Sequence, residues 1–437
     1  MQTKNNKKTI RAWAFFDWAN SAYNLVITST IFPAYYVAIT ANDKNNNHVN
    51  FFGHSFVNTA LSDYTLAAAY LMVALLLPIL TSIADYRGNK KIFMQFFTWL
   101  GAASCGMLYF FKIDTLETSM LFFGLAAIGY SGGFVFYNSY LPEIATLDMQ
   151  DRVSAKGFTY GYIGSVILQL ICFAFVLKPE WFGIVDKSFP ARLSFLLVGL
   201  WWICFAYIPF TILPKGSPNA KSHHTDLIRG GFIELGKVWK QVKQMPVLKR
   251  YLPAFFFYSM GVQTIMLVAT SFGAKELHMQ TSSLIQIILI IQIVAIGGAT
   301  LMSRLSEKYG NIQVLAGVVI IWIGTCVAAY FTTTSNQFYV LAIIVGLVMG
   351  GIQSLSRSTY SKLIPQDIPD SASFFSFYDV TEKLAIVGGM FSFGLVDDIT
   401  NSMRNSTLVL CVYFLIGLAL LVSLLLFKKR AANAAIQ

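Results

Sequence analysis

Polar and charged side chains inside apolar stretches are the groups that could carry chemistry in this sequence. The first such stretch contains FFDWANSAYN, in which Asp17, Asn20, Ser21 and Asn24 interrupt an apolar run from residue 12 to about residue 39. On a helix these four positions form one polar stripe, because residues three, four and seven apart share a face. Since a polar stripe facing lipid is costly, it predicts contact with a water-filled cavity.

A second polar stripe supplies a basic partner for a carboxylate. It lies at helical spacing within residues 338–361 and comprises Gly346, Gly350, Gln353, Arg357 and Tyr360. We expect Arg357 to bind Asp17, to bind a carboxylate of a substrate, or to extend to the membrane surface. Asp17 is accordingly interpreted as a gate, as a proton or substrate site, or as a packing residue.

The densest charge in an apolar stretch is the segment YDVTEK, residues 378–383. Asp379 and Lys383 have the favourable acid-before-base spacing of a helical pair, which leaves Glu382 as an extra carboxylate beside Tyr378. An ion inside a membrane costs on the order of 2.5–3.5 kcal/mol, so we expect these groups to be paired or hydrated. Glu382 is a candidate proton carrier, or the cluster is structural and joins the second and eleventh helices.

Single polar residues on other helices are further candidates for contact with a substrate. Tyr130, Tyr137 and Gln263 are expected either to contact a substrate or to satisfy a neighbouring group. Gly157, Gly161 and Gly164 form a small-residue face that predicts close contact between helices.

These residues must be positioned by membrane-spanning helices. Of the 437 residues, 56% are hydrophobic and only 12% are charged, and the mean hydropathy of +0.59 is too high for a soluble domain. About 20 apolar residues cross a bilayer as a helix, and the period-two pattern of barrel strands is absent. The sequence therefore predicts an all-α polytopic membrane protein with twelve transmembrane helices, at about 12–39, 60–84, 92–111, 118–140, 155–177, 191–213, 251–274, 283–303, 312–331, 338–361, 374–396 and 406–427.

The distribution of basic residues predicts the orientation in the membrane. Most of the 32 Lys and Arg residues fall before the first helix, after the last one, or in every second loop between them. Basic residues favour the cytoplasmic side, so both termini are expected there, in what we take to be a bacterial inner membrane. The net charge of +11 is explained by this topology and by contact with anionic lipid, and offers no argument for nucleic acid.

An internal repeat divides the chain into two six-helix halves, residues 1–213 and 251–437. The segment FFDWANSAYNLVITSTIF (15–32) aligns without gaps with FFFYSMGVQTIMLVATSF (255–272), where Phe257 stands opposite Asp17. After the second helix of each half an acidic residue precedes a glycine by three positions, and these turns contain Asp85, Gly88 and Lys90, and Glu307 and Gly310. We expect the glycine to permit a tight turn and Asp85 to face the positive end of a neighbouring helix, so these five residues form a candidate cytoplasmic gate.

Residues 214–250 are expected to form a cytoplasmic linker. Its second part has an apolar stripe at helical spacing, made by Ile228, Phe232, Leu235, Val238, Trp239 and Val242. The stripe indicates an amphipathic helix at the membrane interface, with a solvated connector as the alternative.

The repeat and its turns resemble the major facilitator superfamily, whose loop motif runs roughly G-x-x-x-D-R-x-G-R-K. Asp85, Gly88 and Lys90 fit that motif, whereas Thr81, Tyr86 and Asn89 depart from it. Three longer stretches, FFDWANSAYN, LPEIA followed by DRVSAKGFTYGYIGS, and GGIQSLSRSTYSKLIP, closely resemble the autophagy-related vacuolar-effluxer-like branch, also called the "unknown major facilitator" family. The resemblance implies a two-bundle fold, alternating access and small-solute export, with neutral amino acids as the solutes of the fungal vacuolar members.

The sequence lacks the motifs of the main competing classes. It has no Gly-x-x-x-x-Gly-Lys-Ser/Thr loop for ATP, no His and Cys cluster for a metal, and no nucleophile placed beside a base. We therefore expect no cofactor and no enzymatic activity. Separately, the chain is expected to be a monomer. The prediction is a secondary active transporter for a small polar solute such as an amino acid, coupled to a proton or another ion. An exporter of amphipathic compounds and a non-transporting receptor are the alternatives.

Overall fold

The computed structural model describes residues 4–41, 47–186, 188–215, 227–366, 371–400 and 402–434, and nearly all of these residues are helical. The first group of helices precedes residue 213. Its elements are α1 (Lys7–Tyr23), a π-helical turn (Asn24–Thr28), α2 (Ile31–Thr40), α3 (Asn58–Arg87), α4 (Lys90–Met107), α5 (Leu116–Asn138), α6 (Leu141–Ile144), α7 (Gln150–Leu177) and α8 (Phe189–Ile212). A short antiparallel hairpin, β1 (His48–Phe51) and β2 (His54–Val57), stands between α2 and α3.

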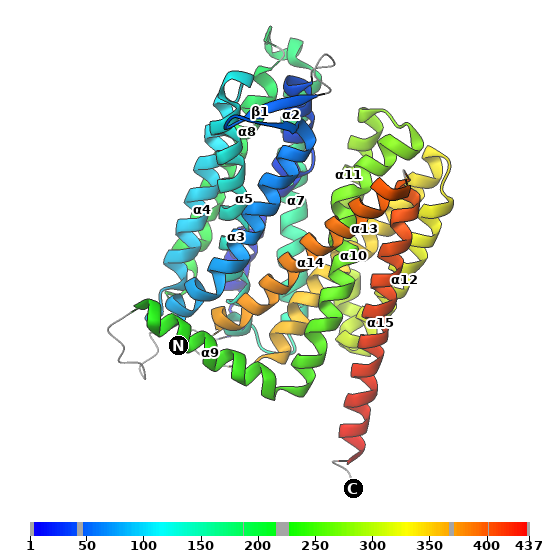
Figure 1. Cartoon of the computed structure of the whole chain (residues 1–437). Coiled ribbons are helices and arrows are strands. Elements are labelled where there is room, and N and C mark those ends of the chain that lie inside the picture. The colour runs from blue at the N-terminus through cyan, green and yellow to red at the C-terminus, as the bar shows by residue number, and fades with distance from the viewer. Residues whose placement is uncertain are drawn as a thin grey trace.

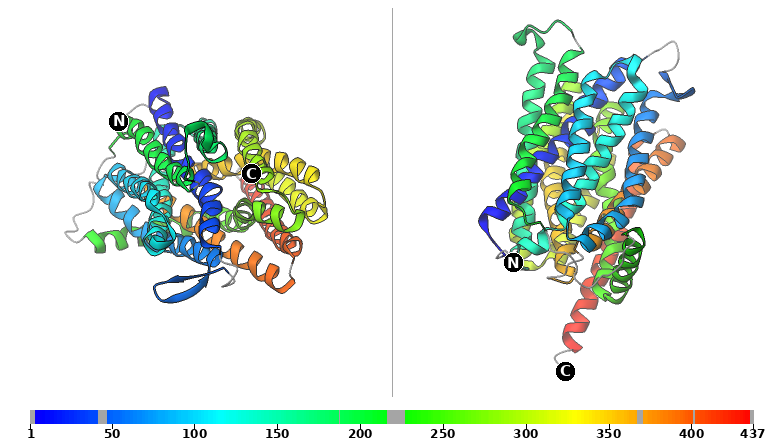
Figure 2. Two further views of the ribbon diagram at one scale, coloured as in Figure 1. Left: turned by 90° about the horizontal axis from the view of Figure 1, so that it is seen from above. Right: turned by 90° about the vertical axis from the view of Figure 1, so that its left-hand side faces the viewer.

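The second group of helices follows α9 (Leu227–Gln244). It consists of α10 (Pro246–Leu277), α11 (Thr281–Tyr309), α12 (Asn311–Phe331), α13 (Ser335–Leu363), α14 (Ser371–Thr400) and α15 (Met403–Ala434). Figure 1 shows the first group on the left and the second on the right, with both ends of the chain at the bottom. We call this end of the molecule the terminal end. The two groups approach each other there and diverge toward the opposite end (Figure 1). Seen from above, the first and second groups lie side by side (Figure 2).

Eleven segments of the described chain are long and apolar enough to cross a membrane. The twelfth predicted span, residues 374–396, lies in α14, a helix of 30 residues that is long enough at about 1.5 Å per residue. It falls short in hydropathy because it carries five charged residues, which are Asp379, Glu382, Lys383, Asp397 and Asp398. The prediction of an all-α polytopic membrane protein is confirmed.

Residues 7–40 form one candidate span, as expected over residues 12–39, but the helix within this span is not continuous. A π-helical turn follows α1, and the chain bends at Ser29 and Thr30 before α2 begins. Pro33 contributes to the break because it has no N–H to donate to the Ser29 carbonyl. The hydroxyls of Ser29 and Thr30 donate to the carbonyls of Asn24 and Leu25 at 2.9 and 2.7 Å, so these carbonyls stay paired.

Helix α9 crosses the terminal end below both groups (Figure 1). Val238 and Val242 are buried, and the ring of Trp239 stacks on Phe377 of α14 with centroids 5.5 Å apart. Phe232 is exposed, while the side chain of Ile228 lies outside the described part of the structure. The C-terminal half of the predicted apolar stripe thus packs on the protein.

Candidate functional site

An ion pair between α1 and α13 lies in the interface between the two groups of helices. Arg357 donates a hydrogen bond from Nη1 to Oδ2 of Asp17 at 3.3 Å, and the hydroxyl of Tyr137 on α5 donates to the same oxygen at 2.6 Å. Both charged side chains are only 1% exposed, so the pair is removed from water. Of the three partners that the sequence left open for Arg357, the structure shows Asp17.

Further contacts fix the guanidinium of Arg357. Nε donates to the Ser154 hydroxyl at 3.0 Å, Nη2 donates to the Ser154 carbonyl at 2.8 Å, and Nη1 also donates to Oδ1 of Asn138 at 3.3 Å. The guanidinium carbon lies 4.8 Å from the ring centroid of Trp13 and 4.2 Å from that of Phe158. Because the guanidinium is planar and its donors point in fixed directions, these contacts allow it one orientation. Arg357 therefore ties α13 to α7 and α5 as well as to α1.

Gly157 on α7 leaves the space that the ion pair occupies. A Cβ atom at this position would lie 2.5 Å from Oδ2 of Asp17, 2.7 Å from the Tyr137 hydroxyl and 2.9 Å from Nη2 of Arg357. These separations are shorter than van der Waals contact, so any larger residue would displace the pair. The predicted role of the glycine face in helix contact is confirmed, and Gly157 in addition makes room for charged groups.

The ionic cluster on α14 is paired differently from the sequence prediction. Lys383 Nζ lies 3.3 Å from Oε2 of Glu382, and Oε1 of the same carboxylate accepts from Gln263 Nε2 on α10 at 2.9 Å. Lys383 also lies 5.5 Å from the ring centroid of Tyr70 on α3, which is in the other group of helices. The expected pair of Asp379 with Lys383 is wrong, because the lysine turns toward Glu382 instead.

Asp379 is completely buried, and it forms no ion pair in the described part of the chain, but its carboxylate lies beside the Asn138 amide. Asn138 accepts from Arg357 through Oδ1, and its amide nitrogen is the group that can donate to Asp379. Tyr378, which precedes Asp379, stacks on Phe255 of α10 with centroids 4.3 Å apart. Asn138 therefore stands between the ion pair on α13 and the acidic cluster on α14.

The polar stripe of the first helix does not share one environment. Asn20 is fully buried, and both its amide atoms lack a partner among the described residues. Ser21 is half-buried and faces Gly161 of α7, where a Cβ would lie 2.5 Å from its Oγ, and Asn24 is half-buried in the π-helical turn. The structure thus does not place the stripe in one water-filled cavity, since Asp17 and Asn20 are enclosed by protein.

The remaining members of the α13 stripe make contacts with protein. Gln353 accepts a hydrogen bond from the Tyr162 hydroxyl of α7 at 2.8 Å, which joins the two groups of helices. Gly346 and Gly350 face the backbone carbonyls of α11, with no room for a side chain. Close approach of helices, rather than space for a ligand, is therefore what these two glycines provide.

The turn after α3 connects the two groups at the terminal end. The Asp85 carboxylate accepts from the backbone N–H of Ser373 at 2.6 Å and of Ala372 at 3.3 Å, in the first turn of α14. As the sequence predicts, Asp85 thus faces the positive end of a helix. Gly88 ends α3 with φ of +64°, and Gly310 after α11 has φ of +89°, both in the region that favours glycine.

Lys90, just after this turn, is buried. It forms an ion pair with Glu143 of α6 and lies 4.1 Å from the ring centroid of Tyr140. Its Nζ also lies 3.4 Å from the hydroxyl of Ser371, and that hydroxyl donates to Glu143 at 2.7 Å. Lys90 and Glu143 therefore both contact the start of α14.

The corresponding turn of the second half makes a more exposed contact. Glu307 on α11 binds the guanidinium of Arg152 on α7 through two hydrogen bonds of 2.5 Å, and the Arg152 side chain is 60% exposed. Next to it, the buried Asp151 accepts from Lys362 at 2.6 Å and from Asn311 at 2.7 Å. Both turns thus link their own half to the opposite one.

The structure adds site residues that the sequence analysis did not select, namely Asn138, Glu143, Asp151, Ser154 and Lys362. Glu143, Asp151 and Ser154 belong to the stretches LPEIA and DRVSA. These stretches contain a cluster of polar residues between two apolar segments, and this was the only sign in the sequence that they could belong to a site. It was too weak alone, because loops are ordinarily polar.

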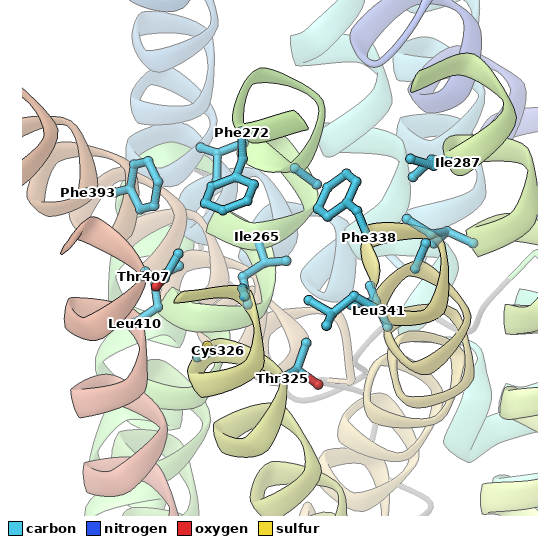
Figure 3. Close-up of a pocket in the computed structure, with 16 residues that line it drawn as sticks. Ile265, Phe272, Ile287, Thr325, Cys326, Phe338, Leu341, Phe393, Thr407 and Leu410 are labelled. Atoms are coloured by element: carbon cyan, nitrogen blue, oxygen red, sulfur yellow. The ribbon is translucent and has the colours of Figure 1, made fainter. Parts of the chain in front are cut away.

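The cavity shown in Figure 3 is separate from these charged groups. It measures about 60 Å³ and lies within the second group of helices, where Phe272, Phe338, Phe393 and Ile265 are among its lining residues. None of the lining residues is ionisable apart from Cys326. Because ligand pockets for drug-sized molecules measure about 300–1,000 Å³, this cavity is too small for such a ligand.

In the described part of the chain, no three His, Cys, Asp or Glu residues gather as metal ligands.

This arrangement of two groups of helices is the fold of major facilitator superfamily transporters. FucP in its outward conformation superposes with a TM-score of 0.70 at 13% identity, over 95% of this chain and 98% of that one. The proton:xylose symporter XylE superposes with a TM-score of 0.68 at 13% identity, over 95% and 94%.

The sequence comparisons are more specific. The family described as "vacuole effluxer Atg22 like" matches residues 5–435, so the chain belongs to that family. It is 34% identical to an uncharacterised MFS-type transporter of Bacillus subtilis (strain 168), over 96% of this chain and 95% of that protein. It is 24% identical to autophagy-related protein 22 of Kluyveromyces lactis, over 94% and 92%. The chain is therefore an MFS-type integral membrane transporter.

Proposed function

We propose that the protein is a secondary active transporter that moves a small polar solute, such as an amino acid, by alternating access. The terminal end is the cytoplasmic side of a bacterial inner membrane, and residues 1–213 and 251–437 move as two bodies joined by residues 214–250. The structure then represents a state closed to the cytoplasm. The distribution of basic residues supports this orientation, and the family description "vacuole effluxer" supports export.

The buried Asp17–Arg357 pair is the observation that carries the proposal. It joins the two bodies, so the cytoplasmic side cannot open without separating the two charges. Separating these two charges without admitting water would be costly, because an unpaired buried charge destabilises a protein by about 3–5 kcal/mol. Water, a proton or a polar solute must replace the lost partner. A polar solute that does so would be coupled directly to opening.

The cytoplasmic gate consists of Asp85, Gly88 and Lys90 in one half and Glu307 and Gly310 in the other. Asp85 and Lys90 contact the start of α14, and Glu307 contacts the start of α7. Each contact crosses between the bodies and must break when that side opens.

Coupling to a proton is assigned to Asp379 and Glu382. The two carboxylates accompany one lysine on α14, so the cluster has one negative charge more than it has positive charges. A proton bound to one of the two carboxylates would bring the net charge of the cluster to zero. XylE, which shares this fold, is a proton:xylose symporter, and this agrees with such coupling.

The test is solute-driven charge movement by the full chain in proteoliposomes. A panel of amino acids, peptides and sugars is jumped onto the membrane at two pH values. We expect one class of solute to produce a pH-dependent current that Asp17→Asn and Glu382→Gln abolish. The matched control is Asp398→Asn, an exposed carboxylate on the same helix α14, which should retain the current.

Two results would contradict the proposal. The first is a silent panel with correctly folded protein, followed by uptake of lipophilic cations, which would establish an amphipathic substrate. The second is a solute current that is unchanged in both carboxylate variants, which would remove Asp17 and Glu382 from coupling.

A further inference from the structure

A groove at the terminal end lies between the start of α1 and the end of α8. Its volume is about 320 Å³. One part is lined by the basic residues Lys7, Lys8 and Arg11, and the other by Ala12, Phe15, Ile208 and Ile212. Neither the ion pair of Asp17 nor the cluster on α14 contributes to it. We call it the basic groove.

The charges of the basic groove are not neutralised by the protein. Lys7, Lys8 and Arg11 are exposed, and none of them has a carboxylate partner in the residues that the structure describes. Lys156 on α7 adds a fourth positive charge close to Arg11. Like charges gathered at one place repel one another, so an anion bound among them would be stabilised.

The apolar part of the groove continues into an aromatic cluster. The ring of Phe15 lies 5.5 Å from Tyr160 and 6.4 Å from Phe205, and Trp18 stacks on Trp201 at 5.8 Å. Aromatic side chains of this kind collect where membrane helices meet the headgroup region. A hydrocarbon chain lying on Ile208, Ile212 and these rings would be shielded from water.

We propose that the basic groove binds an anionic phospholipid of the surrounding membrane. The phosphate lies among Lys7, Lys8 and Arg11, and an acyl chain lies along Ile208 and Ile212. A soluble anion would use the basic part alone and a neutral lipid the apolar part alone, whereas only a lipid with a net negative headgroup uses both. The bound lipid contacts the first turns of α1, the helix that also carries Asp17 six residues after Arg11.

The test is lipid binding to the purified full chain, measured by native mass spectrometry and by the rise in thermal unfolding temperature. The probes are phosphatidylglycerol, phosphatidylcholine with the same acyl chains, and glycerol phosphate. The first variant is Lys7→Gln/Lys8→Gln/Arg11→Gln. Its matched control is Lys428→Gln/Lys429→Gln/Arg430→Gln, which removes three exposed basic residues near the other terminus.

We expect the groove variant to bind phosphatidylglycerol about a hundredfold more weakly, because each basic residue near a membrane surface contributes about a factor of five. The control variant should bind it within about twofold of the unchanged chain, since only non-specific attraction is lost. Ile208→Ser/Ile212→Ser should also weaken binding of phosphatidylglycerol, because it removes the apolar contacts.

Three outcomes would overturn the lipid site. Equal losses in the groove and control variants would mean general surface attraction. Equal binding of phosphatidylcholine would mean that the headgroup charge is not recognised. Full displacement of phosphatidylglycerol by glycerol phosphate, with no effect of Ile208→Ser/Ile212→Ser, would assign the groove to a soluble anion.

Discussion

Arg357 and Asp17 are 340 positions apart in the sequence, yet their side chains form a buried ion pair that joins α13 to α1. Each comes from a different half of the internal repeat. The pair has no counterpart within either half, since Phe257 stands where the repeat would place a second Asp17. It is therefore a link between the halves and not part of the packing of one bundle.

Asp17→Asn should open the terminal end. The substitution leaves the Arg357 charge buried without its counter-ion, which costs about 3–5 kcal/mol in the closed state. We expect the distance between spin labels at Arg87→Cys and Lys308→Cys, exposed positions at the terminal end of each half, to increase. Adding Arg357→Gln to Asp17→Asn should restore part of the shorter distance. An unchanged distance in the single variant would show that the pair does not hold the end closed.

Gly157→Ala should abolish transport without unfolding the protein. The added Cβ would lie within 2.9 Å of three atoms of the ion-pair site, so these groups must separate. Gly317→Ala on α12 is the control, because a Cβ there meets no atom within 4 Å. We expect solute uptake to be lost in the first variant and retained in the second, with both unfolding at similar temperatures. Normal uptake by Gly157→Ala would mean that the pair tolerates displacement.

Asp85→Asn should weaken the closed state more than Glu307→Gln does. Asp85 accepts two backbone N–H groups at the start of α14, where a negative charge contributes up to about 2 kcal/mol when partly buried. The Glu307 partner Arg152 is exposed, and exposed pairs contribute about 0–1 kcal/mol. Spin-label distances at the terminal end give the fraction of molecules in the closed state, and this fraction is compared between the two variants. A larger effect of Glu307→Gln would show that Glu307 stabilises the closed state more than Asp85 does.

Asp379→Asn should preserve or raise the unfolding temperature, because it removes a fully buried carboxylate that forms no ion pair in the described chain. Glu382→Gln should lower that temperature, since it leaves Lys383 with a neutral partner. Thermal unfolding in one detergent compares the two variants directly. If Asp379→Asn were the more destabilising variant, Asp379 would be the true partner of Lys383.

The sequence by itself determined the class of fold and most of the residues of interest. Apolar stretches of membrane-spanning length require helices, because lipid offers no hydrogen-bond partners to the backbone. Charged residues are rare in such stretches because placing a charge in lipid costs free energy. Asp17, Arg357 and Glu382 could therefore be selected from the sequence alone. Comparison of the two halves also placed Asp85 and Gly88 in a turn after the second helix.

Only the tertiary structure decided which of these groups meet. Helical spacing favoured Asp379 as the partner of Lys383, but the lysine binds Glu382, because Gln263 and Tyr70 from other helices surround that side of α14. Asn138 and Ser154 escaped selection since uncharged polar residues are common at helix ends. Their importance arises from Arg357, which reaches them from the other half of the chain. Pairing energies depend on distance and on burial in three dimensions, and neither quantity is contained in the spacing of residues along one helix.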